Sequence, residues 1–172
     1  MEKIFYTQRS CYPTSEHAVK KVLSEYFGIA DVSIFKTPNG KPYLLNKQLF
    51  FSVSHTETML FLAFSDKEIG LDAEREQRKI NYSRILKNFS SEEALEIRST
   101  QDFLKHWVAK ESAIKHIGGT LANDFKNTAY IQKRIFFNGE QLPFTLSELT
   151  FDGHFLAVCC ENDFKTAEFL PI

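Results

Sequence analysis

The chain has 172 residues, 21 basic and 22 acidic side chains, and a formal net charge of −1. This length suits one ordinary domain or two small halves that share a core. Apolar residues make up 43% and charged residues 25%, which argues against a disordered chain, a collagen or a coiled coil. The near-neutral charge argues against a dedicated nucleic-acid binder, because such proteins usually present a strongly basic face.

Targeting and redox signals point to the cytoplasm. The N-terminus has no long apolar stretch, so we expect no signal peptide. No apolar run approaches the roughly 20 residues that a membrane-spanning helix needs, so we expect no membrane contact. Cys11, Cys159 and Cys160 are odd in number and lack the spacing of a metal site, which predicts buried thiols in a reducing compartment.

The first part of the chain predicts a strand, a helix and three further strands. Residues 3–6 form the first strand. Apolar residues recur at helical spacing from Val19 to Tyr26, and Gly28 is typical of the end of a helix. Further strands are predicted at residues 49–54, 59–64 and 69–74. The middle one is apolar throughout, so we expect it to be buried on both faces.

The second part of the chain predicts helices followed by strands. Ser90 and Glu93 have the spacing of a capping box. A longer helix is predicted over residues 101–116, and the glycine pair that follows would end it. The Asn138-Gly139 pair predicts a hairpin turn after a strand at residues 129–137. The last strands are predicted at residues 154–160 and 165–170.

Three pairs of segments repeat in the same order at nearly one offset. Residues 16–20 resemble residues 111–115, residues 51–54 resemble residues 144–147, and residues 61–64 resemble residues 155–158. The repeat favours a duplicated unit, so that the chain has two halves that pack against each other. We place the halves at residues 1–75 and 76–172. Neither is large enough for a comfortable core of its own, so a site is expected in the cleft between them.

Two carboxylates stand side by side on the predicted strand at residues 69–74. Asp72 and Glu74 are two residues apart, so they share one face of the strand, while apolar residues alternate with them on the other. Like charges so close repel unless solvent or a cation separates them. Such a pair is either a solvated strand edge or part of a metal site.

The long helix adds a third carboxylate and a lysine. Glu111 follows the apolar residue Trp107 by four positions, and Lys115 follows Glu111 by four more. The pair is either an exposed ion pair or a hard oxygen ligand beside a phosphate-binding lysine. Carboxylates without histidine or cysteine suit Mg²⁺.

Two further groups could bind phosphate. Ser54 and His55 end the strand at residues 49–54 and could both donate to a phosphate oxygen; in isolation they are a turn serine and a surface histidine. No elbow motif surrounds Ser54, and adjacent strand residues point to opposite faces, so a Ser–His nucleophile pair is a weak hypothesis. Lys41 lies on a turn that presents it.

Together these motifs resemble those of the 4′-phosphopantetheinyl transferases. The resemblance rests on four ordered segments: Gly40-Lys41-Pro42-Tyr43, Phe51-Ser52-Val53-Ser54-His55-Thr56, Ile69-Gly70-Leu71-Asp72-Ala73-Glu74 and Trp107-Val108-Ala109-Lys110-Glu111-Ser112-Ala113-Ile114-Lys115. It is strong over residues 38–121 and weak in the flanks. Each motif alone is loose, whereas the four in this order are specific.

The resemblance implies an activity and its substrates. Members of the family transfer the phosphopantetheine arm of coenzyme A to a serine of an apo acyl or peptidyl carrier protein and release adenosine 3′,5′-bisphosphate. The chain is similar to a compact version of the long type. That resemblance implies a monomer with an α+β fold of two pseudo-symmetric halves, each a helix packed on a small antiparallel sheet, with coenzyme A in the cleft between them.

The resemblance also assigns roles to residues. Asp72, Glu74 and Glu111 would hold Mg²⁺ on the pyrophosphate, and Lys115 would contact the phosphates. Ser54 and His55 would bind the phosphate on the ribose, and Lys41 would bind the nucleotide end. Glu111, directly or through water, is the expected base for the incoming serine, with Lys115 stabilising the charge that develops.

Two features depart from the family or extend it. An arginine that family members usually have near the first helix has no match, and Arg9, Lys20 and Lys21 are the possible substitutes. Because carrier proteins are generally acidic, the basic side chains between the metal motif and the capping box form a candidate docking surface; they are Arg75, Arg78, Lys79, Arg84 and Lys87.

Two other functions stay open. A non-catalytic module of the same fold would bind coenzyme A or a carrier protein without transferring the arm. A Ser–His hydrolase would use Ser54 as its nucleophile. The combination of three carboxylates with Lys115 favours the transferase over both.

Overall fold

The computed structural model describes residues 3–45 and 48–172, and it confirms a mixed α+β fold. Four helices are described: α1 (Ser15–Phe27), α2 (Ser91–Glu96), α3 (Thr100–Ile117) and α4 (Leu121–Asp124). The strands are β1 (Lys3–Gln8), β2 (Phe35–Lys36), β3 (Pro42–Tyr43), β4 (Phe50–His55), β5 (Met59–Ser65), β6 (Ile69–Arg75), β7 (Thr128–Ile131), β8 (Arg134–Phe137), β9 (Glu140–Gln141), β10 (Thr145–Phe151), β11 (His154–Cys160) and β12 (Glu168–Pro171). No helix of the described residues is long and apolar enough to cross a membrane.

Two sheets pack face to face in the middle of the molecule. One has the strand order β12-β1-β5-β4 and the other the order β10-β11-β6. Their shared core includes Ile4 and Phe61 from the first sheet and Leu71 and Val158 from the second. β5 is buried along its whole length, as its continuous apolar sequence predicts, because one face contacts this core and the other faces α1.

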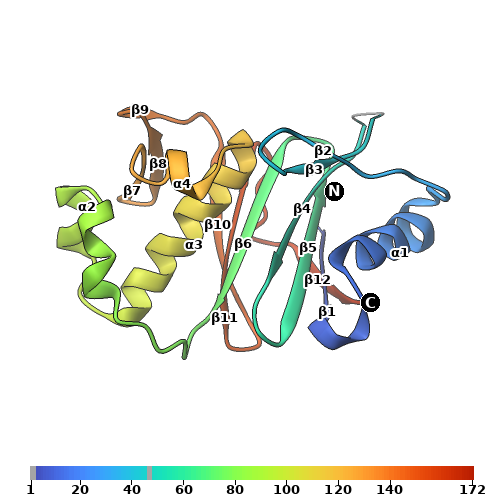
Figure 1. Cartoon of the computed structure of the whole chain (residues 1–172), viewed down its shortest axis with the longest axis horizontal. Coiled ribbons are helices and arrows are strands. Elements are labelled where there is room, and N and C mark those ends of the chain that lie inside the picture. Colours follow the sequence, from blue (N-terminus) through green and yellow to red (C-terminus); the bar gives the residue numbers. More distant parts are fainter. Residues whose placement is uncertain (1–2, 46–47) are drawn as a thin grey trace.

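Each sheet is covered on its outer side by one helix, so the layers run α1, sheet, sheet, α3 (Figure 1). α1 buries Val19, Val22 and Leu23 against Phe5 and Leu62 of the first sheet. α3 packs on β6 and β11 of the second. The small sheet β7-β8-β9 and the short helices α2 and α4 lie beyond α3.

The two sheets exchange strands along the chain. β6 lies within residues 1–75 but pairs with β11, and β12, at the end of the chain, pairs with β1. The segments that repeat in the sequence fall on α1 and α3, on β4 and β10, and on β5 and β11. A pseudo-symmetric relation between the halves, and the boundary at residue 75, stay predictions.

Most predicted elements are confirmed with shifts of one or two residues, and two differ. The strand expected at residues 129–137 is two strands, β7 and β8, because Gln132 and Lys133 adopt left-handed backbone conformations that turn the chain back on itself. The last strand begins at Glu168 and not at residue 165. The Asn138-Gly139 turn is present, but it joins β8 to β9.

Gly70 on β6 sets the spacing between this strand and α3. A Cβ at this position would collide with backbone atoms of Ser112 and His116 on the helix. These are main-chain atoms, so a side chain cannot simply rotate away, and the helix would have to move.

We therefore expect Gly70→Ala to lower the free energy of unfolding by about 3 kcal/mol or more, at the upper end of what overpacking costs. Gly139→Ala is a matched control, because nothing lies near that position and the cost there is only that of a left-handed backbone. Urea denaturation of both variants measures the difference. Equal effects would contradict the close approach.

Candidate functional site

The end of α3 places a lysine on the carboxylate of β6. The Lys115 Nζ lies 2.7 Å from the Asp72 Oδ1 and donates to the carbonyl oxygen of Leu71 at 3.0 Å. A longer contact, 3.4 Å, reaches the carbonyl of Val53 on β4. Lys115 therefore joins the helix to both sheets at the seam between them, where the sequence predicts a site.

Asp72 is buried, and a serine of the neighbouring sheet shares it. The Ser54 hydroxyl donates to the Asp72 Oδ1 at 2.8 Å and accepts from the backbone N–H of Ala73 at 3.1 Å. A hydroxyl can donate only one hydrogen bond, and in this conformation Ser54 donates it to Asp72. His55, the next residue, is exposed. The two residues thus lie in different surroundings, which does not favour the Ser–His hydrolase.

Glu111 lies beside Asp72, and its side chain is only 15% exposed. Burial, followed by the negative charge of Asp72, raises the pKa of Glu111 to about 8. Burial also raises the pKa of Glu74; Arg78, which pairs with Glu74, opposes this shift, and Asp72 adds to it. Three carboxylates therefore lie close together here, and the positive charges of one lysine and one arginine offset them only in part.

The donor chemistry of this cluster fits Mg²⁺, which prefers carboxylate oxygens. Two observations support the fit: the donors are all carboxylates, and burial together with the negative charge of Asp72 raises the pKa values of Glu74 and Glu111, a shift that a bound cation would offset. In this conformation no three His, Cys, Asp or Glu side chains of the described residues form a ligating group. Lys115 forms an ion pair with Asp72, and Arg78 forms one with Glu74, so both ion pairs would have to open when Mg²⁺ binds.

The predicted turn at Lys41 reaches across to the end of α3. The Lys41 Nζ pairs with Glu68 at 2.6 Å and donates to the carbonyl of His116 at 2.8 Å. The Asn39 side chain donates to the carbonyl of Gly118. A positive charge is favourable at this helix end because its carbonyl groups lack partners. Lys41 and Lys115 thus both lie at the last turn of α3.

Of the three N-terminal basic residues, Arg9 lies nearest to the Ser54-His55 motif. Its guanidinium donates to the carbonyl of Thr56 at 3.3 Å. Lys20 pairs with Glu16 on the surface of α1, and Lys21 lies over the ring of Tyr12. The sequence could not choose among the three, because the approach of β1 to the β4–β5 turn is a tertiary contact.

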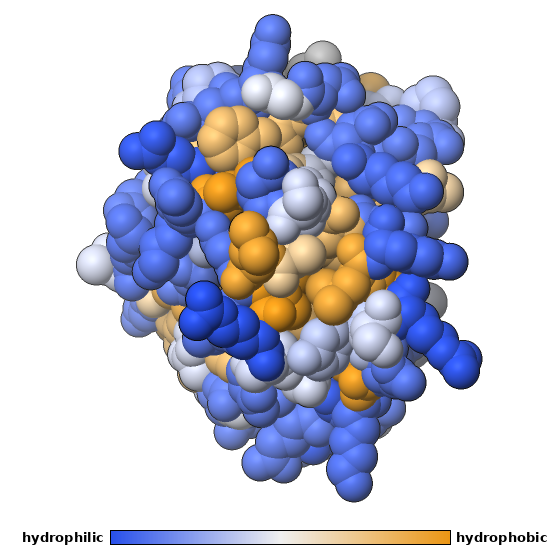
Figure 2. All heavy atoms as spheres, turned by 90° about the vertical axis from the view of Figure 1, so that its left-hand side faces the viewer, coloured by the Kyte–Doolittle hydropathy of each residue, from blue (hydrophilic) through white to orange (hydrophobic). Residues whose placement is uncertain are grey.

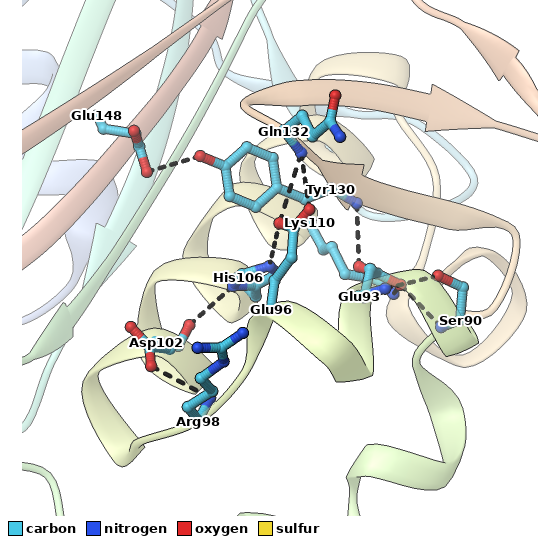
Figure 3. A network of polar contacts seen from close by, with 10 residues as sticks. All are labelled: Ser90, Glu93, Glu96, Arg98, Asp102, His106, Lys110, Tyr130, Gln132 and Glu148. Carbon is cyan, nitrogen blue, oxygen red and sulfur yellow. Dashed lines mark hydrogen bonds and ion pairs between the residues drawn. The ribbon is translucent and has the colours of Figure 1, made fainter.

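A buried ion pair joins α3 to α2, and the sequence did not predict it. Lys110 points from α3 toward Glu93 at the start of α2 (Figure 3). Both side chains are fully buried, with 3.0 Å between the Lys110 Nζ and the Glu93 Oε2. Glu93 also accepts from the backbone N–H groups of Ser90 and Tyr130. The capping box was the available signal, but the lysine lies 17 residues further along the chain.

The surroundings of Lys110 are apolar apart from Glu93. Its ammonium group lies 4.3 Å from the ring centres of Phe89 and Phe125. Burial lowers the pKa of Lys110, and Glu93 opposes this shift. Removing one partner would leave the other charge buried alone, which is costlier than losing the pair.

We expect Lys110→Met to lower the free energy of unfolding by about 3–5 kcal/mol. The double variant Lys110→Met/Glu93→Gln should recover at least half of that loss, because it leaves no unpaired charge. Urea denaturation at pH 7 measures both. A single variant as stable as the natural chain would show that the pair is not buried as described.

A model of the 4′-phosphopantetheinyl transferase superfamily matches residues 68–159, which is more than half of the chain. The matched part includes Asp72 and Glu74 on β6 and Glu111 and Lys115 on α3, and the segments around Lys41 and Ser54 precede it. The resemblance found in the sequence is thereby confirmed. No curated protein matches the chain.

Proposed function

Because the chain belongs to the 4′-phosphopantetheinyl transferase superfamily, we propose that it transfers the 4′-phosphopantetheine arm of coenzyme A to a serine of an apo acyl or peptidyl carrier protein. The second product is adenosine 3′,5′-bisphosphate. The observation that supports this most directly is the arrangement of Glu111 and Lys115 against Asp72 at the seam of the two sheets.

The reaction needs positive charge where this cluster lies. Attack of a serine hydroxyl on the β-phosphorus increases negative charge on the phosphoryl oxygens. Asp72, Glu74 and Glu111 would hold Mg²⁺, which when bound would stabilise that charge and orient the pyrophosphate. Lys115 would turn from Asp72 toward a phosphate oxygen, a short movement because its ammonium group is already at the seam.

The remaining roles belong to the nucleotide and to the serine proton. We assign binding of the ribose phosphate to His55, which is exposed, and to Ser54. The Ser54 hydroxyl would donate to the phosphate in place of its present hydrogen bond to Asp72. Lys41 would contact the nucleotide end, and Arg9 would supply the missing N-terminal basic group. Glu111, directly or through water, would accept the proton of the incoming serine. A monomer would suffice, since one chain contributes all of these groups.

A non-catalytic coenzyme A or carrier-binding module is the second candidate. It is favoured by one observation: Asp72 and Glu74 are each paired with a basic side chain in this conformation. Such a module would keep these pairs in the presence of Mg²⁺ and coenzyme A, whereas the transferase would open them.

Asp72→Asn and Glu111→Gln distinguish the two candidates. Each should lower the release of adenosine 3′,5′-bisphosphate at least about 100-fold, because a carboxylate that would hold Mg²⁺ is lost. Neither should unfold the chain, since the shapes are kept; thermal unfolding checks this. Glu168→Gln, on β12, is the matched control and should be fully active. Normal release from either site variant would contradict the assignment.

The carrier protein needs a surface close to α3. Figure 2 shows apolar side chains gathered on the face at the α2 end of the molecule, with hydrophilic side chains around them. A groove of about 320 Å³ lies there, lined by Ile85, Trp107, Leu121 and Phe125 among others. Trp107 is one helical turn before Glu111, so a protein seated in the groove would be close to the proposed site.

The charge around this groove suits an acidic partner. Residues 75–90 contain five basic side chains and one acidic one, a balance of 5 − 1 = +4, in a chain whose formal net charge is −1. Arg75 pairs with Glu57, and Arg78 pairs with Glu74. We therefore place carrier docking on the groove and foremost on Lys79, Arg84 and Lys87, which are exposed.

Arg84→Glu/Lys87→Glu should lower kcat/KM for the carrier protein about tenfold and flatten its dependence on salt, because rim charges act mainly on association. The affinity for coenzyme A should not change, as calorimetry can verify. Lys133→Glu/Lys165→Glu reverses two exposed charges elsewhere and is the control. Unchanged carrier kinetics in the first variant would remove this docking surface.

A further inference from the structure

A buried histidine of the second sheet contacts the turn that follows the Ser54-His55 motif. The His154 Nε2 lies 3.3 Å from the Thr56 Oγ1, although the two residues are 98 positions apart. Both are almost fully buried, with exposed fractions of 4% and 7%. The contact crosses the seam between the two sheets, and none of the roles assigned above uses His154.

The proton positions of this contact follow from its partners. The His154 Nδ1 lies 2.7 Å from the carbonyl oxygen of Asp152, and a carbonyl can only accept. Nδ1 therefore has the proton, the Nε2 of the neutral ring is an acceptor, and the Thr56 hydroxyl donates to it. The Thr56 oxygen in turn accepts from the backbone N–H of Met59 at 3.1 Å. Every polar atom of the pair is satisfied in one arrangement.

The position of His154 is fixed by contacts within the second sheet and with the core. His154 follows the tight turn at Asp152 and Gly153, whose left-handed conformations join β10 to β11. The carbonyl of Gly153 accepts from the N–H of Glu76, just beyond β6. The ring also packs edge-on against Phe61 of β5. Its position is thus fixed by the second sheet and by the core.

The other contacts of the Thr56 turn come from its own residues and from Arg9. The backbone N–H of Thr56 donates to the carbonyl of Met59, and Arg9 donates to the carbonyl oxygens of Thr56 and Thr58. His55 immediately precedes Thr56 and ends β4, with its side chain exposed. Whatever fixes Thr56 therefore also holds the backbone from which the His55 side chain extends.

We infer that His154 is a positioning residue for His55: through Thr56 it sets the geometry with which the first sheet meets the ribose phosphate of coenzyme A. The inference rests on the proposed function, because it requires that the chain binds coenzyme A. It predicts that loss of the His154–Thr56 hydrogen bond weakens recognition of that one phosphate more than binding of the rest of the molecule.

The test compares coenzyme A with 3′-dephospho-coenzyme A by calorimetry. The ratio of the two Kd values measures how much the ribose phosphate contributes. His154→Phe keeps an aromatic ring against Phe61 but removes both hydrogen bonds, and Thr56→Val keeps the shape of the threonine without its hydroxyl. His154→Gln and Thr56→Ser are the matched conservative variants, since each retains a polar group that can form the hydrogen bond.

We expect the ratio to fall about tenfold in His154→Phe and Thr56→Val, the size of one well-placed hydrogen bond to a charged group, and to recover in the conservative variants. A merely structural role would weaken both ligands equally and leave the ratio unchanged, which would overturn the inference. Should His154→Phe fail to fold, the Thr56 pair decides.

The natural chain separates this inference from the proposed function. If it binds coenzyme A more tightly than the dephospho form and all variants keep that ratio, only the role of His154 is wrong. If it binds neither ligand, the proposed function fails, and the inference fails with it.

Discussion

The close packing of α3 on β6 is the constraint on which the rest of the structure depends. Glycine at position 70 lets the backbone of the helix approach the strand. At that separation Lys115 reaches Asp72, and Glu111 is held beside the same carboxylate with little access to water. Burial, with the negative charge of Asp72 in addition, raises the pKa values of Glu74 and Glu111, and a cation bound to these carboxylates would offset both effects.

Polar side chains on β4 and on the turn that follows it join the two sheets at the seam. The Ser52 hydroxyl accepts from the N–H of Leu71, Ser54 binds Asp72 and Ala73, and Thr56 binds His154. Ser52 and Ser54 are two apart, so they share one face of the strand, and Thr56 directly follows its end. The contacts that hold the sheets together therefore lie directly beside His55 and Asp72, which links the stability of the seam to the geometry of the proposed site.

Much of the fold follows from periodicity, whereas contacts between distant segments do not. Helical spacing and Gly28 or Gly118 predict α1 and α3, and the unbroken apolar run predicts the burial of β5. The motif order predicts the family, and the shared face of Asp72 and Glu74 follows from strand geometry. The turn at Gln132 was missed because it lacks glycine, and the Lys110–Glu93 pair because no local pattern indicates a buried lysine. Arg9 could be distinguished from Lys20 and Lys21 only by tertiary packing.

The most direct test of the central claim is intact-protein mass spectrometry of several apo carrier proteins after incubation with the chain, coenzyme A and Mg²⁺, with a parallel reaction in chelator. The proposed function predicts that at least one carrier gains the mass of a single phosphopantetheine arm, and that the chelator prevents the gain. No gain on any carrier, while calorimetry shows coenzyme A bound, would contradict transfer and leave a binding module of the same fold.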